Sequence, residues 1–182
     1  MRATKTKRQQ RLLSGLAAAI GMQAAAYAVS APDVPDQIKA PAGERLVFQA
    51  HASGAQIYVC QPGADGKSMW TLKAPEAQLY DRKGAVVGHH YAGPTWKHYD
   101  GSEVTGKASA KVDSPDPDSI PWLLVIATGH SGAGVFAQVT SIQRIHTKGG
   151  QAPAAASCDS SRLGTGATIP YTADYYFYAP AK

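Results

Sequence analysis

The sequence has almost no net charge outside its first 28 residues. The 182-residue chain carries 18 Lys and Arg against 13 Asp and Glu, a formal charge of +5. Five of those cations and none of the acids lie within residues 1–28, so the remainder holds 13 of each sign. A protein that binds nucleic acid needs surplus positive charge to neutralise phosphates. The remaining chain therefore gives no electrostatic support for nucleic acid as a partner.

The sequence also lacks an apolar run that makes a convincing membrane span. Its most apolar stretch, Leu12 to Ala28, is alanine-rich and short, and it follows a cluster of five Lys and Arg. Ala26-Tyr27-Ala28 has the small residues that signal peptidase recognises. We predict a signal peptide over residues 1–28, cleaved near Ala28, and a secreted or periplasmic protein with no stable membrane span after cleavage. An uncleaved anchor helix is the alternative.

Cysteine is scarce as well: only Cys60 and Cys158 are present. An even number of cysteines in an exported chain favours a disulfide, and the alternatives are a free buried thiol or a metal ligand. A Cys60–Cys158 bridge would close nearly the whole domain. In the chain-entropy treatment, such a loop stabilises the folded state by roughly 4–5 kcal/mol.

Apolar and polar residues alternate with a period of two from Leu46 onward, which predicts β-strands. Short alternating runs are separated by residue pairs typical of turns. These pairs are Ser53-Gly54, Asp65-Gly66, Lys83-Gly84, Gly93-Pro94 and Asp100-Gly101. We therefore predict an all-β, single-domain antiparallel β-sandwich or barrel with long loops over residues 44–180, after an extended lead-in at 29–43.

The second half of the chain follows the same pattern with one slip. Trp122 to Ala127 is a continuous apolar run, typical of a strand buried on both faces, although a buried helix gives the same pattern. Val135 to Val139 alternates and then falls out of phase, which predicts a strand with a β-bulge near Thr140. Residues 147–166 are predicted to be loop. Tyr171 to Phe177 is predicted to be a final strand with its odd-numbered residues on one face.

Histidine and aromatic side chains gather in residues 88–101, around Gly93-Pro94. A four-residue turn at 92–95 would place His89 opposite His98, with Asp100 diagonal on the same face. Two histidines and a carboxylate can hold a divalent transition metal and leave positions open for substrate. This pattern predicts a metal site, and with it a metal-dependent enzyme or metal-binding protein.

The metal site depends on the length of that turn. A three-residue turn would instead pair His90 with Trp96 and place His98 opposite Gly88, because a shift of one residue changes every partner. The simplest alternative is that these histidines are half-exposed strand residues bonded to backbone carbonyls or water.

The same segment also suits a bound ligand. His90, Tyr91, Trp96 and Tyr99 have rings that combine an apolar body with a polar atom, as glycan-binding and aromatic-binding sites often do. We therefore take an unknown small molecule or glycan as the candidate partner.

The segment from Gly129 to Gly134 has some resemblance to a nucleophile elbow, with Ser131 as the nucleophile. A hydrolase elbow requires Gly-x-Ser-x-Gly, and Ala133 stands where the last glycine is needed. A glycine-rich hairpin loop explains the segment more simply than a Ser131 hydrolase does.

A third cluster consists of Arg144, His146 and Lys148, which could line an anion site. Alternating polar residues on a solvent-facing strand have the same pattern, and that interpretation is favoured.

Several strings along the chain, taken together in order, resemble the uncharacterised and mostly exported family known as domain of unknown function 3455. Among them are Gln56-Ile57-Tyr58-Val59-Cys60, Gly88-His89-His90-Tyr91-Ala92-Gly93-Pro94-Thr95-Trp96, Ile142-Gln143-Arg144-Ile145 and Tyr171-Thr172-Ala173-Asp174-Tyr175. The resemblance spans nearly all of residues 33–180. It implies export and a single domain, and it brings no activity and no catalytic residues.

The sequence thus favours a non-enzymatic extracytoplasmic binding or surface-associated module. The metal-dependent protein that would use His89, His98 and Asp100 is the alternative, and a Ser131 hydrolase is the second alternative.

Overall fold

The computed structural model describes residues 30–64 and 66–181. The predicted signal peptide and its cleavage point lie outside the described residues. Within the described part of the chain, no helix is both long enough and apolar enough to cross a membrane.

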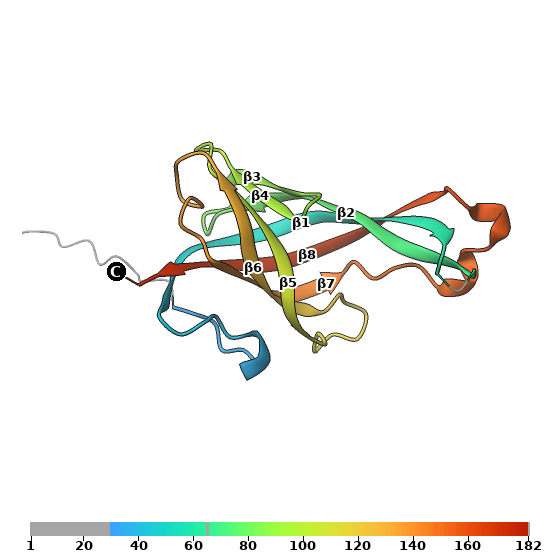
Figure 1. Cartoon of the computed structure of the whole chain (residues 1–182), viewed down its shortest axis with the longest axis horizontal. Coiled ribbons are helices and arrows are strands. Elements are labelled where there is room, and N and C mark those ends of the chain that lie inside the picture. Colours follow the sequence, from blue (N-terminus) through green and yellow to red (C-terminus); the bar gives the residue numbers. More distant parts are fainter. Residues whose placement is uncertain (1–29, 65, 182) are drawn as a thin grey trace, which may run out of the picture.

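Eight antiparallel strands follow one another around a closed barrel, and β8 returns to pair with β1 (Figure 1). The strands are β1 (Glu44–Pro62), β2 (Ser68–Tyr80), β3 (Val86–Tyr91), β4 (Thr95–His98), β5 (Glu103–Val112), β6 (Trp122–Ser131), β7 (Ser141–Gly149) and β8 (Gly166–Pro180). Three short 3-10 helices complete the described secondary structure: η1 (Asp36–Ile38), η2 (Ala155–Ser157) and η3 (Ser160–Arg162). The prediction of an all-β antiparallel fold is confirmed, in its barrel form.

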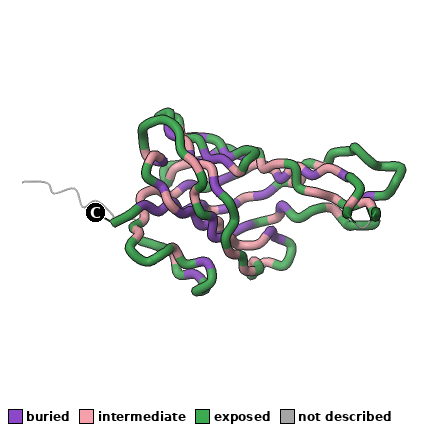
Figure 2. Tube along the Cα trace, viewed as in Figure 1, coloured by how far each residue is buried: buried purple, intermediate pink, exposed green. Residues whose placement is uncertain are grey.

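Strand β8 shows how the alternation builds the core. Its residues Tyr171, Ala173, Tyr175 and Phe177 are buried on the inner face, as the alternation predicts. Tyr176 and Tyr178 on the outer face are also buried, because the lead-in crosses over them with Val34 and Ile38. The last part of β8 is therefore covered on both sides, and buried residues concentrate in the barrel body (Figure 2).

Strand β1 continues through Ser53-Gly54, where a turn was predicted, so that prediction is wrong. Gly54 allows β1 and β2 to approach each other closely, since a Cβ at position 54 would collide with the carbonyl oxygen of Glu76. Because β1 is so long, it extends beyond the barrel with β2 and β8 as a three-stranded arm, on the right in Figure 1.

The predicted disulfide is confirmed near the end of this arm. Cys60 and Cys158 are bonded, with a Cα–Cα distance of 5.5 Å and a sequence separation of 98 residues. Beside the disulfide, Trp70 Nε1 donates a hydrogen bond to Ser157 Oγ at 3.0 Å. Both contacts hold the segment that contains η2 and η3 against the arm. That segment is shorter than the predicted loop, because β7 extends to Gly149.

The strand predicted over Val135 to Val139 is a turn-rich loop instead. Gly132 and Gly134 have positive φ angles of 69° and 144°, which break the extended conformation. The apolar residues of the loop fold inward, and Phe136 is fully buried. The predicted bulge near Thr140 is also wrong, since β7 has its irregularity between Ile145 and Lys148.

The other predicted turns are confirmed as hairpin connections. Gly66 lies in the connection between β1 and β2, whereas Asp65 lies outside the described residues. Lys83-Gly84 lies between β2 and β3. Gly93-Pro94 connects β3 to β4, and Asp100-Gly101 connects β4 to β5.

Candidate functional site

The β3–β4 hairpin has a three-residue turn at 92–94, so the four-residue turn on which the metal site depended is wrong. Tyr91 pairs with Thr95, and His90 pairs with Trp96. Thr95 Oγ1 donates to the carbonyl oxygen of Ala92 at 2.9 Å, and Gly93 has a φ of 130°. This positive φ, which glycine tolerates, allows the tighter turn.

The shifted register separates His89 from the other two predicted metal ligands, His98 and Asp100, which stay in contact. His89 faces Lys97, and His98 faces Gly88. His89 Nε2 lies 3.0 Å from the exposed Tyr99 hydroxyl, whereas His98 Nδ1 lies 3.1 Å from a carboxylate oxygen of Asp100. Across residues 30–64 and 66–181, no group of three or more His, Cys, Asp or Glu is placed to hold a metal ion.

Asp100 instead holds the loop that closes one end of the barrel. Its carboxylate accepts hydrogen bonds from Ser102 N at 2.9 Å, Ser102 Oγ at 2.6 Å and Val135 N at 2.8 Å. Burial raises the pKa of Asp100, but these hydrogen bonds and nearby His98 together lower the pKa well below its usual 3.8. The adjoining Phe136 stacks on Phe177, with ring centroids 4.4 Å apart.

Two of the four predicted ligand-binding residues lie inside the barrel. His90 and Trp96 are 3% and 1% exposed, and their rings stack at 4.4 Å. His90 Nδ1 is 2.8 Å from the carbonyl oxygen of Thr95, which only accepts, so Nδ1 carries the proton. Burial lowers the pKa of His90 from 6.5 to about 3, and the ring is neutral at pH 7.

Tyr91 lies outside because successive strand residues point to opposite faces, and Tyr99 lies outside in the turn that follows β4. The Tyr91 hydroxyl donates to Glu103 Oε2 at 2.8 Å, and this bond raises the pKa of Tyr91. Tyr99 is 59% exposed and packs edge-on against His89. The predicted quartet is therefore divided into an inner and an outer pair.

A cavity of about 650 Å³ opens where the short β3–β4 hairpin ends. β3 pairs with β2 only over Ala77–Tyr80, and β4 pairs with β5 only up to Thr105. Beyond these points, no strand of the described residues lies between β2 and β5. The cavity lies in this gap and reaches inward, with lining residues from all eight strands.

Buried polar atoms without partners lie around this cavity. Among the described residues, three buried side-chain nitrogens form no hydrogen bond, and the residues that carry two of them, Gln56 and Trp96, line the cavity. An unpaired buried donor costs free energy unless a ligand or water satisfies it. The third such nitrogen belongs to Trp122, which packs on the outer cluster under the lead-in.

Arg144 also lines the cavity, on β7 opposite Tyr175 of β8. Its Nη2 and Nε donate to the carbonyl oxygen of Pro121 at 2.8 and 3.2 Å. Burial raises the pKa of Tyr175, and the positive charge of Arg144 acts against this rise. Arg144 thus contributes a cationic group beside the buried aromatic residues.

The predicted cluster of Arg144, His146 and Lys148 is split by the bulge in β7. His146 Nδ1 lies 2.9 Å from a carboxylate oxygen of Asp174, and Lys148 Nζ lies 2.9 Å from one of Asp116, both exposed. Only Arg144 reaches the cavity, so the solvent-facing interpretation holds for the other two.

Gln56 and Tyr175 were not predicted as site residues. Gln56 is 1% exposed and lies between Gly54 and Tyr58 on the inner face of β1. Once β1 is taken as continuous through Gly54, the period-two pattern that starts at Leu46 places this polar residue at an inward position, and that signal could have identified it.

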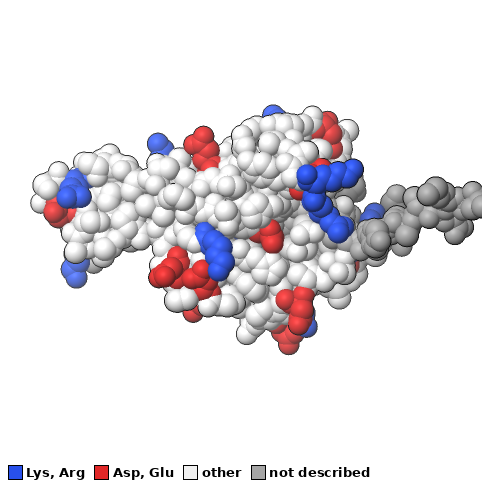
Figure 3. Space-filling model, turned by 180° about the vertical axis from the view of Figure 1, so that it is seen from behind, with Lys and Arg blue, Asp and Glu red and all other residues white. Residues whose placement is uncertain are grey.

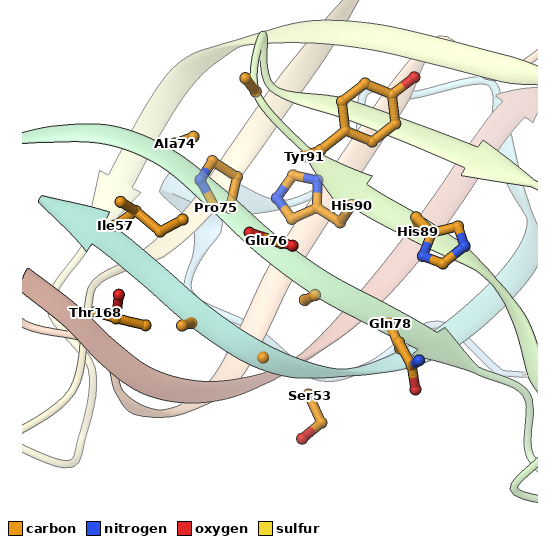
Figure 4. Close-up of a pocket in the computed structure, with 14 residues that line it drawn as sticks. Ser53, Ile57, Ala74, Pro75, Glu76, Gln78, His89, His90, Tyr91 and Thr168 are labelled. Carbon is orange, nitrogen blue, oxygen red and sulfur yellow. The ribbon is translucent and has the colours of Figure 1, made fainter.

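A second hollow of about 740 Å³ lies over β1, β2 and β3 (Figure 4). Its lining includes Ser53, Glu76, Gln78 and His89, and the two hollows share Ala74, Pro75 and His90. The residues with unpaired buried nitrogens, Gln56 and Trp96, do not line it. The barrel cavity is therefore the stronger candidate.

Ser131 lies exposed at the end of β6. Within the part of the chain that the structure describes, its hydroxyl has no hydrogen bond to a histidine. The neighbouring His130 instead places Nε2 2.6 Å from the carbonyl oxygen of Val139. The paired nucleophile and base that a serine hydrolase requires are not formed by these groups.

Comparison with known proteins agrees with the resemblance found in the sequence. The family model described as Protein of unknown function (DUF3455) matches residues 41–179. The chain belongs to this family. The match covers all eight strands except Pro180, the last residue of β8. The barrel is therefore the fold of the matched region. No curated protein and no solved structure matches the chain.

Proposed function

We propose that this protein is an exported binding protein that holds a small molecule in the barrel cavity. The observation that carries the proposal is the pair of unpaired buried nitrogens, Gln56 Nε2 and Trp96 Nε1, on residues that line a cavity of about 650 Å³. Small eight-stranded barrels have interiors of a size that holds one small ligand.

The closed end and the cavity end of the barrel differ in how they are filled, and this difference supports binding over a purely structural role. Phe136 and Phe177 fill the closed end with stacked rings. The cavity end has apolar walls with a few polar groups among them, which is the usual composition of a small-molecule site. A barrel selected for stability alone would fill this end with apolar side chains too.

The test is a ligand-observed NMR screen of the purified protein against a fragment library. Each hit is then measured with Ala108→Trp, which places an indole at the cavity entrance, and with Ser109→Trp as the matched control. Ala108 lines the cavity, whereas Ser109 is the next residue on β5 and is exposed outside it.

We expect hits whose affinity falls at least about tenfold in Ala108→Trp and changes little in Ser109→Trp, because only the first substitution blocks the entrance. A screen without hits, or hits that both variants bind equally well, would contradict the proposal.

A further inference from the structure

The charges around the barrel cavity are all of one sign. Among the described residues, Lys73, Lys107 and Arg144 line it, and no Asp or Glu does. This is unexpected for a chain whose residues 29–182 carry equal numbers of both signs. On the face shown in Figure 3, cationic and anionic side chains are interspersed, so the cavity differs from that surface.

These three cations also lack anionic partners. Among the described residues, Lys73, Lys107 and Arg144 form no ion pair with a carboxylate. Exposed cations elsewhere, such as Lys83 and Lys111, form none either, so the partly buried Arg144 is the informative one. Arg144 is only partly exposed, and its hydrogen-bond partners among the described residues, the carbonyl of Pro121 and the hydroxyl of Tyr175, are uncharged. A partly buried guanidinium without a carboxylate is a strong donor to a bound anion.

The uncharged donors at the cavity favour an anion as well. Gln56 and Trp96 are each 1% exposed, and each has an N–H group without an acceptor. His90 is neutral and adds no charge of its own. The lining thus offers unsatisfied donors and uncompensated positive charge together.

Apart from Thr128, most of the remaining wall is apolar. Leu72 and Pro75 come from β2, and Leu123 and Val125 come from β6. Lys73 and Lys107 are exposed, on either side of the gap between β2 and β5, whereas Arg144 lies deeper against the buried Tyr175. An occupant that satisfies this lining has an apolar body and one anionic group.

We propose that the ligand is a small apolar carboxylate whose carboxylate group binds Arg144, with the N–H groups of Gln56 and Trp96 as further donors. This inference rests on the proposed function and specifies its ligand class. The planar guanidinium matches a carboxylate by two parallel hydrogen bonds. The two lysines attract the anion to the entrance.

The test compares acids with their uncharged amides. Phenylacetate, 1-naphthaleneacetate and decanoate are each titrated beside phenylacetamide, 1-naphthaleneacetamide and decanamide, by calorimetry or NMR. The members of each pair have nearly the same shape and differ in charge. We expect at least one acid to bind about tenfold or more tightly than its amide, as for a hydrogen bond to a charged group.

The variant Arg144→Met should reduce that acid-over-amide ratio to about one, while Arg82→Met, in the exposed β2–β3 turn, should leave it unchanged. Arg144→Lys keeps the charge without the planar fork and should retain part of the preference. Thermal unfolding of each variant establishes that it is folded. If Arg144→Met is unfolded, Arg144→Lys is compared with the wild type instead. An acid-over-amide ratio as large as that of the wild type would then overturn the carboxylate inference.

The outcomes separate the two proposals. If fragments bind in the cavity but no acid binds better than its amide, or the preference survives in Arg144→Met, the carboxylate inference is overturned and the binding function stands. If neither the fragments nor any member of the panel binds, the proposed function fails and the inference fails with it.

Discussion

The two ends of the barrel interior are built in opposite ways. At the closed end, Phe48, Phe136 and Phe177 pack ring against ring, and the Asp100 carboxylate accepts three hydrogen bonds. At the cavity end, the N–H groups of Gln56 and Trp96 have no acceptor among the described residues, and Arg144 has no acidic partner.

This difference indicates that the closed end stabilises the fold and that the cavity end serves binding. Satisfied polar groups and close packing stabilise the fold, whereas unsatisfied donors lower stability unless something binds them. Substitutions at the closed end should therefore act on stability, and those at the cavity end should act on binding.

The largest expected effect is at the closed end. Phe136→Ala removes a fully buried ring from the aromatic stack, and we expect the free energy of unfolding to fall by about 3–5 kcal/mol. Leu163→Ala is the control, because Leu163 is 44% exposed and should change stability little. Urea unfolding measures both, and a loss below about 1 kcal/mol in Phe136→Ala would show that the loop does not close the barrel.

Asp100→Asn should lower stability by about 2–3 kcal/mol at pH 7, because charge-assisted hydrogen bonds to the closing loop are weakened. The pKa of Asp100 is below 3.8 in the folded protein. Its contribution is therefore present above that value and is lost as the pH falls through the folded pKa. The curves of unfolding free energy for wild type and variant should converge in strong acid, and parallel curves would contradict this role. Asp113→Asn, at an exposed loop position, is the control.

At the cavity end, His90→Asn tests the buried neutral ring. The folded pKa of about 3 lies below the ordinary 6.5, so the unfolded chain binds more protons between these values. Stability from this group is present above pH 6.5 and is lost as the pH falls toward 3, by about 1.4 kcal/mol per pH unit.

The measurement is the difference in unfolding free energy between wild type and His90→Asn across pH 6 to 4. The difference should shrink with decreasing pH, and His90→Gln should give the same trend, because neither amide titrates. A difference that stays constant with pH would mean that His90 is protonated in the folded protein.

The alternation of residues predicted most of this barrel, and its failures have local causes. The inner face of β8 and the Asp100-Gly101 turn follow directly from period two and a turn pair. Gly54 was taken for a turn because a glycine within a strand, placed for close approach, has the same local signal.

The sequence predicted only part of the candidate site, again because one local pattern is compatible with two structures. His90 and Trp96 were identified, but the Gly93-Pro94 pair is compatible with two turn lengths, and only the shorter one places these two residues opposite each other inside. Tyr91 then falls on the outer face. Gln56 is a candidate because its side-chain N–H has no acceptor, and Arg144 because it has no carboxylate partner among the described residues. Both are properties of the folded arrangement.

The smallest expected effect on stability is at the cavity itself. Trp96→Phe removes an N–H without an acceptor, so the lost ring area is partly offset and the unfolding free energy should change by less than about 1 kcal/mol. Trp70→Phe is the matched control, because Trp70 Nε1 does donate to Ser157 and its loss should cost about 1 kcal/mol. The effects on affinity should be the reverse. Trp96→Phe should lower the affinity for the preferred acid about fivefold, and Trp70→Phe should leave that affinity unchanged. If Trp96→Phe instead lowers stability by several kcal/mol with affinity intact, the indole of Trp96 serves packing and not binding, and the two ends of the barrel are alike.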